Sequence, residues 1–220
     1  MIKNWYKIVG SLLLLYVVIM GFLGQVPRQA ILNETVRNLY FHVTMWFSMI
    51  YLLGTSVFYA IKYLKNPLEE YDVKSESFAY VGILFGTFGM ITGSIWAKYT
   101  WGYWWTNDPK LNSASIGMLI YCAYLILRGS FSDEQRMARI SAVYNIFAFC
   151  IFMVLIWILP RLTESLHPGN GGNPGFKIYD TDHLMRIVFY PAIIGWIMLG
   201  YWISNLTIRL KQLNNKLNEA

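Results

Sequence analysis

Six long runs of apolar residues constrain the fold of this chain more than any other feature of its sequence. Each approaches the ~20 residues that an α-helix needs to cross the roughly 30 Å hydrocarbon core of a bilayer. The runs span Trp5–Leu23, Val43–Leu64, Phe78–Trp96, Ser113–Leu127, Ile140–Leu159 and Leu184–Leu206. Backbone polar groups inside lipid must be satisfied within their own segment. We therefore predict an all-α integral membrane protein with six transmembrane helices, forming a single polytopic domain over residues 1–220.

The composition supports a membrane location. Only 14% of the residues are charged and 56% are hydrophobic, whereas a soluble domain has about a quarter of its residues charged. The first apolar run lacks a small-residue cleavage site, which predicts a retained helix rather than a signal peptide. Cys122 and Cys150 form no CxxC, zinc or CxxCH pattern. They are expected to be small core residues, and the chain is not itself a c-type cytochrome.

The distribution of basic residues predicts the orientation. Of the 18 Lys and Arg residues, 11 lie in the N-terminus, the second and fourth loops and the C-terminal tail, and 7 lie in the other three loops. This bias favours both termini in the cytoplasm. With six spans, the first, third and fifth loops share one side of the membrane whichever way the chain inserts. Residues that those three loops carry can therefore meet at one face.

The third loop contains the densest aromatic cluster. Residues 101–109, called here the tryptophan segment, hold three of the nine tryptophans. If the segment is helical, four side chains share one face: Trp101, Trp104, Trp105 and Asp108. Such a face would be an aromatic shelf with a carboxylate at its end. Asp108-Pro109 is typical of an N-cap followed by a proline at the first helical position, which predicts that the next helix begins there.

Two interpretations of these aromatic residues remain open. Tryptophan and tyrosine collect at the membrane–water boundary because their rings prefer the headgroup layer and their polar atoms stay hydrated. Three tryptophans on one face, with Trp96, Tyr99 and Tyr103 nearby, exceed what an anchor needs. A flat hydrophobic ligand is therefore the second interpretation.

All three histidines lie on the side of the tryptophan segment. His42 is placed among apolar residues where the first loop enters the second span, and an ionisable residue there usually has a function or a partner. It is either a ligand or a hydrogen-bonding residue that contacts neighbouring backbone or Asn38. His183 follows Asp180 and Asp182 in a polar cluster typical of a solvated helix start, which makes it the weaker ligand candidate.

The fifth loop, Pro160 to Asp182, is rich in glycine, proline and asparagine around His167. It can fold over a ligand held between helices, or it is a solvated connector. Two neutral imidazoles on opposite faces of an iron macrocycle would hold haem. A basic residue would then pair with its propionates. The candidates on this side are Arg37, which is the best placed, and Arg28, Lys98, Lys110 and Arg161.

Common enzyme motifs are absent. The sequence contains no GxSxG elbow, no GxxxxGK[ST] loop and no HExxH, so hydrolytic or ATP-driven chemistry is not expected and the chain is not predicted to be an enzyme. Glu69, Glu70 and Asp72 lie between the second and third runs and are expected to be solvated.

Three segments resemble a known family. The tryptophan segment resembles the signature of the WWD haem-handling membrane proteins, close to WGxxWxWDxRLT. It matches at Trp101, Gly102, Trp105, Asp108 and Leu111, with Trp104 as an additional tryptophan. Tyr40, His42, Val43 and Trp46 are similar to the pattern YxHVPxAW, and Leu166-His167 with Pro168-Gly169 to LHxG. Together with the six spans and the short length, they resemble the cytochrome c maturation protein C (CcmC) family of haem exporter or haem-delivery proteins over nearly the whole chain.

The chain departs from the family patterns at three places. Asn107 stands where the pattern has its last tryptophan, which removes one aromatic wall. Lys110 replaces an arginine. Thr44-Met45 stands in place of Pro-x, so the proline near one proposed ligand is missing.

The resemblance implies a haem-trafficking function. Non-covalent, transiently held b-type haem would bind at the periplasmic face of the bacterial inner membrane, with His42 and His167 as axial ligands. The tryptophan segment, with Trp101, Trp104, Trp105 and Asp108, and Arg37 would contact it. The implied partners are a membrane-anchored periplasmic haem chaperone (CcmE) and the ATP-binding cassette subunits CcmA and CcmB. The alternatives are a relative of the cytochrome c synthetase and a non-haem subunit of a transporter.

Overall fold

The computed structural model describes residues 4–27, 32–167 and 182–218, and the chain is helical nearly throughout them. The helices are α1 (Trp5–Leu23), η2 (Asn33–Asn38), α2 (Leu39–Lys65), α3 (Glu69–Trp101), α4 (Pro109–Gly129), α5 (Glu134–Met153), η3 (Val154–Ile158), α6 (Leu159–Leu162) and α7 (His183–Asn218). Within the described residues, six helical segments are long and apolar enough to cross a membrane. The predicted all-α fold with six spans is confirmed.

The helices are longer than the apolar runs that predicted them. The bounds of α1 agree with the prediction, whereas α3 begins at Glu69 and not at Phe78, and ends at Trp101 and not at Trp96. A helix continues past the hydrocarbon boundary because backbone hydrogen bonding does not depend on side-chain polarity. The apolar run marks only the part of the helix suited to lipid.

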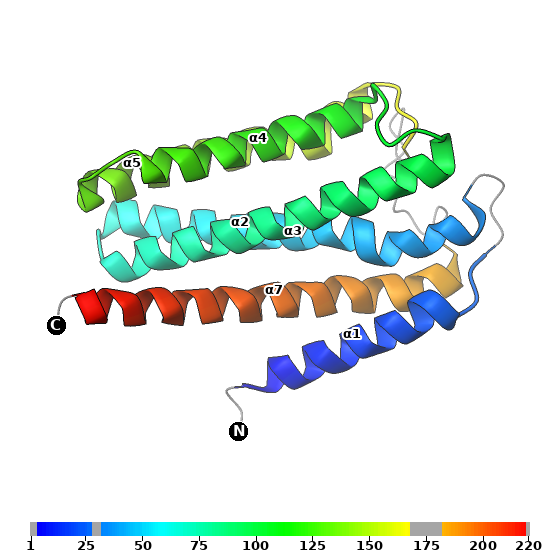
Figure 1. Ribbon diagram of the computed structural model, residues 1–220, viewed down its shortest axis with the longest axis horizontal. Coiled ribbons are helices and arrows are strands. Elements are labelled where there is room, and N and C mark those ends of the chain that lie inside the picture. The colour runs from blue at the N-terminus through cyan, green and yellow to red at the C-terminus, as the bar shows by residue number, and fades with distance from the viewer. Residues whose placement is uncertain (1–3, 28–31, 168–181, 219–220) are drawn as a thin grey trace.

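The helices form three adjacent pairs (Figure 1). The pair α2–α3 lies in the middle, with α4–α5 on one side of it and α1–α7 on the other. The end of α7 and the connections α2–α3 and α4–α5 lie at one end of the bundle, called here the terminal end. The end of α3 and the starts of α2 and α4 lie at the other end, called here the distal end.

The tryptophan segment is not helical from Gly102 to Asp108. Helix α3 ends at Trp101, and Gly102 adopts the left-handed conformation (φ 84°), donating its N–H to the carbonyl of Lys98. Glycine ends helices in this way because it has no Cβ to strain. The condition under which Trp101, Trp104, Trp105 and Asp108 would share one helix face is therefore not met. The segment is instead an irregular connection.

The predicted start of α4 is confirmed. Asp108 is the N-cap residue and Pro109 occupies the first turn. The Asp108 carboxylate accepts the amide of Lys110 at 2.9 Å and that of Leu111 at 3.4 Å. These bonds satisfy donors that a helix leaves unpaired at its first turn.

Helix α5 continues into a wider π-helical turn, Val154–Ile158, before α6. Pro160 has no N–H to donate to the carbonyl of Ile156, so the regular ladder cannot pass this point. The wider turn carries Ile156 and Trp157 to the lining of a cavity at the distal end.

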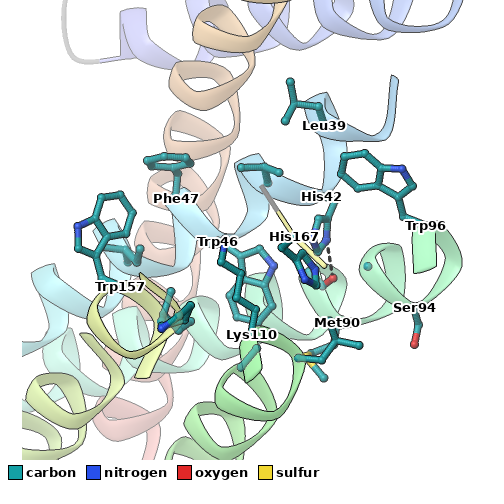
Figure 2. A pocket seen from close by; sticks show the side chains of 18 of the residues that line it. Leu39, His42, Trp46, Phe47, Met90, Ser94, Trp96, Lys110, Trp157 and His167 are labelled. Carbon is teal, nitrogen blue, oxygen red and sulfur yellow. Dashed lines mark hydrogen bonds between the residues drawn. The ribbon is translucent and has the colours of Figure 1, made fainter. Parts of the chain in front are cut away.

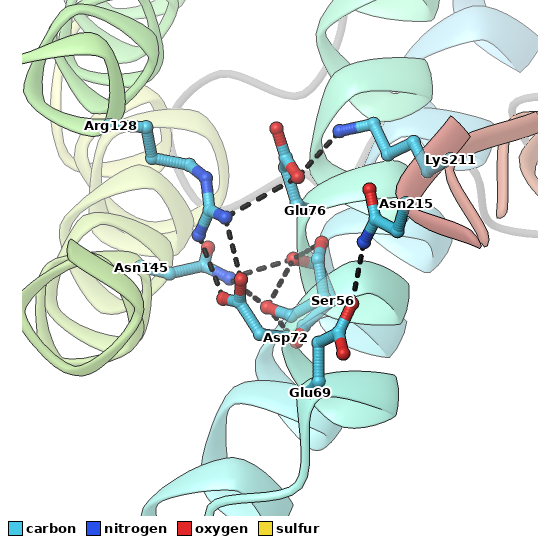
Figure 3. A network of polar contacts seen from close by, with 9 residues as sticks. Ser56, Glu69, Asp72, Glu76, Arg128, Asn145, Lys211 and Asn215 are labelled. Carbon is cyan, nitrogen blue, oxygen red and sulfur yellow. Dashed lines mark hydrogen bonds and ion pairs between the residues drawn. The ribbon is translucent and has the colours of Figure 1, made fainter. Parts of the chain in front are cut away.

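A buried ion-pair cluster closes the terminal end (Figure 3). Arg128 of α4 makes two hydrogen bonds, of 2.8 and 2.7 Å, to the carboxylate of Asp72 on α3. Its guanidinium also lies 3.3 Å from Glu76, which pairs with Lys211 of α7. The prediction that Asp72 is solvated is wrong, because the helical extension of α3 brings its carboxylate against α4.

We predict that Arg128→Ala lowers the free energy of unfolding by roughly 3–5 kcal/mol, because the Asp72 carboxylate would stay buried without its partner. Thermal and denaturant unfolding in detergent micelles measures the change. Lys74→Ala is the control, since its partner Glu70 is exposed and such pairs contribute about 1 kcal/mol or less. Equal losses in the two variants would contradict the assignment of a buried pair.

Candidate functional site

A cavity of about 370 Å³ lies at the distal end, between α2, α3, the start of α4 and the π-helical turn (Figure 2). Its lining is mostly apolar and includes two of the three histidines and four of the nine tryptophans: His42, His167, Trp46, Trp96, Trp105 and Trp157. Segments from the first, third and fifth connections therefore meet at one cavity. This agrees with the prediction that the odd-numbered loops of a six-span chain share one side of the membrane.

His42 is held by a neighbouring helix. Its Nδ1 atom lies 2.9 Å from the carbonyl oxygen of Gly89 on α3 and 3.3 Å from Oγ1 of Thr92. A carbonyl can only accept, so Nδ1 carries the proton and Nε2 has the lone pair. Asn38, the other partner considered from sequence, instead donates to the carbonyl of Thr92. A hydrogen-bonded Nδ1 does not exclude ligation, since it orients Nε2 as metal-binding histidines require.

Two glycines of α3 make room for the side chains of α2. A Cβ at Gly93 would lie 2.5 Å from Cε1 of His42, and one at Gly89 would lie 3.0 Å from Cε2 of Trp46. The His42 ring also has edge contacts with Trp96 and Trp46, with centroids 5.8 and 6.4 Å away. Sequence reasoning missed these glycines, although their spacing of one helical turn was a readable sign of close helix approach.

His167 is held by a carboxylate. Its Nδ1 lies 3.0 Å from Oδ1 of Asp108, and its ring packs edge-on against Trp101 with centroids 4.8 Å apart. An ionised carboxylate can only accept, so Nδ1 donates, and in the neutral imidazole the lone pair is then on Nε2. The two cavity histidines therefore share one feature, a partner fixed at Nδ1.

Asp108 joins the third and fifth connections. Its side chain is buried and accepts the Ser165 hydroxyl at 3.0 Å and the Leu166 amide at 2.7 Å, besides His167 and its own helix cap. Burial raises the pKa of Asp108, but the hydrogen bonds from His167, Leu166 and Ser165 lower it further, so the net pKa is well below the ordinary carboxyl value. The group is an anion at neutral pH.

The other predicted site residues lie at different distances from the cavity. Trp105 lines it, whereas Trp101 contacts His167 from outside the lining and Trp104 is 58% exposed. Arg37 does not line the cavity. It pairs with Glu34 and donates to the carbonyls of Gly21 and Gly24 at the end of α1.

The remaining basic candidates also differ in position. Lys110 lines the cavity, Lys98 donates to the carbonyl of Gly102, and Arg161 stacks on Trp157 at 4.6 Å. Arg28 lies outside the described residues. His183 is exposed at the start of α7, as its polar neighbours predicted.

The lining of this site suits a flat apolar ligand, because indole rings surround the two imidazoles. In the described part of the chain, no group of three or more His, Cys, Asp or Glu could hold a metal ion.

Comparison with known proteins shows the family to which the chain belongs. The family model "Heme exporter protein C" matches residues 1–219. The Heme exporter protein C of Haemophilus influenzae is 26% identical over 210 residues, covering 92% of this chain and 82% of that protein. That of Escherichia coli is 23% identical over 219 residues, covering 96% and 82%. The Cytochrome c biogenesis protein CcsA of Prochlorococcus marinus is 41% identical over 83 residues, only 38% of this chain and 26% of that protein. The chain therefore belongs to the Heme exporter protein C family.

We predict that Gly93→Ala displaces the His42 ring and lowers the free energy of unfolding by roughly 1–3 kcal/mol, since the added methyl group overpacks the α2–α3 contact. Thermal unfolding in detergent measures the loss. Gly129→Ala, at a position where a Cβ meets nothing within 4 Å, is the control and should be neutral or slightly stabilising. A neutral Gly93→Ala would show that His42 is not tightly fitted.

We predict that Asp108→Ala costs about 2 kcal/mol or more, against about 1 kcal/mol for Asp133→Ala, which removes only the exposed N-cap of α5. Because the folded-state pKa of Asp108 is depressed, its contribution is full above the unfolded carboxyl pKa of about 4 and is lost as pH falls below it. Denaturant unfolding across pH and amide exchange at Leu166 measure this. An Asp108→Ala penalty that does not change with pH would contradict the carboxylate junction.

Proposed function

We propose that this member of the Heme exporter protein C family binds haem in the distal cavity, with His42 and His167 as axial ligands, and delivers it for cytochrome c biogenesis. One observation carries the proposal. Two imidazoles from separate parts of the chain line one apolar cavity, and each has its Nδ1 occupied by a fixed acceptor. In its neutral form each ring then has its lone pair on Nε2, the nitrogen left to bind iron.

The lining of the cavity suits this cargo. A volume of about 370 Å³ lies within the roughly 300–1,000 Å³ of small-molecule sites. The indoles of Trp46, Trp96 and Trp105 supply flat apolar walls. The proposed cargo is a non-covalently held b-type haem, and neither cysteine lies in the cavity lining that the structure describes. A carrier must also release its cargo, which ligation through two neutral nitrogens permits.

The charged rim supports recognition of the haem propionates. Lys110, at the start of α4, lines the cavity, and we assign it the pairing with a propionate. Arg37 lies outside the cavity lining and supports it indirectly. Its guanidinium bonds η2 to the end of α1, and Val36 of η2 lines the cavity. Its predicted contact with haem would require that side chain to leave Glu34.

Delivery requires an accessible surface next to the cavity. Trp104 and Tyr103 are 58% and 68% exposed beside Trp105, which lines the cavity, and they form the docking surface in this proposal. The recipient is a membrane-anchored periplasmic haem chaperone (CcmE), and the ATP-dependent steps belong to CcmA and CcmB. The distal end then faces the periplasm of a bacterial inner membrane and both termini face the cytoplasm. The chain acts as a carrier and not as an enzyme.

The competing functions have weaker support. A relative of the cytochrome c synthetase would account for the CcsA match, but that match covers only 26% of the CcsA protein. A non-haem transporter subunit would account for the six spans, but not for two oriented histidines at one cavity.

We predict that the purified protein, supplied with haem, gives a low-spin absorption spectrum, and that His42→Ala and His167→Ala each weaken it or make it high-spin. Absorption spectra of the oxidised and reduced protein test this. His183→Ala is the matched control, because His183 is exposed and outside the cavity lining. A wild type that stays colourless would reject haem binding, and an effect of His183→Ala equal to that of the other two would reject the ligand assignment.

A further inference from the structure

We propose that the distal cavity is a dead end, which haem enters and leaves at the distal end of the bundle. This inference rests on the proposed function. It gives the chain a definite place in the reaction sequence. A separate transbilayer transport step, carried out by another protein, must bring haem to the distal side before this chain receives it.

The cavity has a floor. Its lining residues furthest toward the terminal end on their own helices are Ile50, Gly89, Ala114 and Ile156. The next turn is filled, because a Cβ at Gly86 would lie 2.5 Å from the sulfur atoms of both Met49 and Met118. Helices α2, α3 and α4 are in contact there, with no room for a macrocycle.

The contact between α4 and α5 is equally close. A Cβ at Gly117 would lie 2.7 Å from the ring of Phe152, which is fully buried and packs edge-on against Tyr121 at 5.9 Å. Tyr121 in turn contacts Tyr124, with centroids 6.3 Å apart. Packed aromatic rings therefore fill the space between α4 and α5 from the cavity toward the terminal end.

A buried polar layer follows. Asn145 of α5 donates to the hydroxyl of Ser56 on α2 at 2.7 Å and lies 3.3 Å from that of Ser75 on α3. All three side chains are buried and satisfy one another. Separating these helices would leave polar groups without partners in an apolar interior, which is costly.

The ion-pair cluster forms the last layer (Figure 3). Asp72, Arg128, Glu76 and Lys211 join α3, α4 and α7. From Ile50 to Tyr63, α2 rises about 20 Å through these layers. The second described hollow, about 490 Å³ at the terminal end, shares no lining residue with the distal cavity among the described residues.

Thiol labelling from each side of the membrane tests the dead end. Ala114→Cys, on the cavity floor, and Asn214→Cys, on the terminal hollow, are made separately with Cys122 and Cys150 changed to alanine. A membrane-impermeant thiol reagent is then applied to right-side-out and to inverted vesicles, with and without haemin. Asn214→Cys identifies the terminal side.

We expect Ala114→Cys to react only from the distal side, at least tenfold faster than from the terminal side, and haemin to slow that reaction. Labelling from the terminal side, or from neither side, would overturn the dead end. Labelling from the distal side that haemin leaves unchanged would support a dead end and reject haem binding in the cavity, so the two proposals fail separately.

Discussion

The arrangement of the distal end depends on one buried carboxylate. Asp108 caps α4, accepts hydrogen bonds from Ser165 and Leu166 and orients the imidazole of His167. These roles are compatible because every partner is a donor and the carboxylate is only an acceptor. A neutral amide could not replace all of them without turning a donor toward another donor. The local need for a helix cap and the long-range need for an oriented histidine therefore select the same residue.

The two histidines are held by unequal partners. His42 donates to a neutral backbone carbonyl of α3, while His167 donates to an anion. A carboxylate at Nδ1 raises the basicity of a ligating imidazole more than a carbonyl does. In the proposed haem complex His167 would therefore be the more basic of the two ligands. His42 lies in α2 and is positioned by its contact with α3. His167 lies in the connection after α6 and is positioned by its hydrogen bond to Asp108.

Much of the architecture followed from the sequence because it depends on local rules. The length of the apolar runs predicted the six spans, and the Asp108-Pro109 pair predicted the start of α4. The alternation of loops across six spans predicted that His42 and His167 lie at one end. The errors arose where tertiary contacts decide. Nothing near Asp72 indicates that Arg128, 56 positions later, neutralises it, and the left-handed Gly102 ends the helix that would have aligned Trp101 with Trp104. The roles of the predicted haem-contacting residues remain predictions, and those of residues 168–181 lie outside the described chain.

The two halves of the bundle differ in the polarity of their interiors, and the difference determines where a ligand could pass. At the distal end the helices enclose an apolar hollow, while the terminal half is closed by rings, by an amide–hydroxyl layer and by ion pairs. Opening that half for a planar ligand would expose several unpaired polar groups at once, and nothing apolar in such a ligand could satisfy them. A protein built to conduct haem through its own core would not place such buried polar contacts where the ligand has to pass. On the proposed function, the six helices hold a cargo at one face and do not conduct it through the bundle.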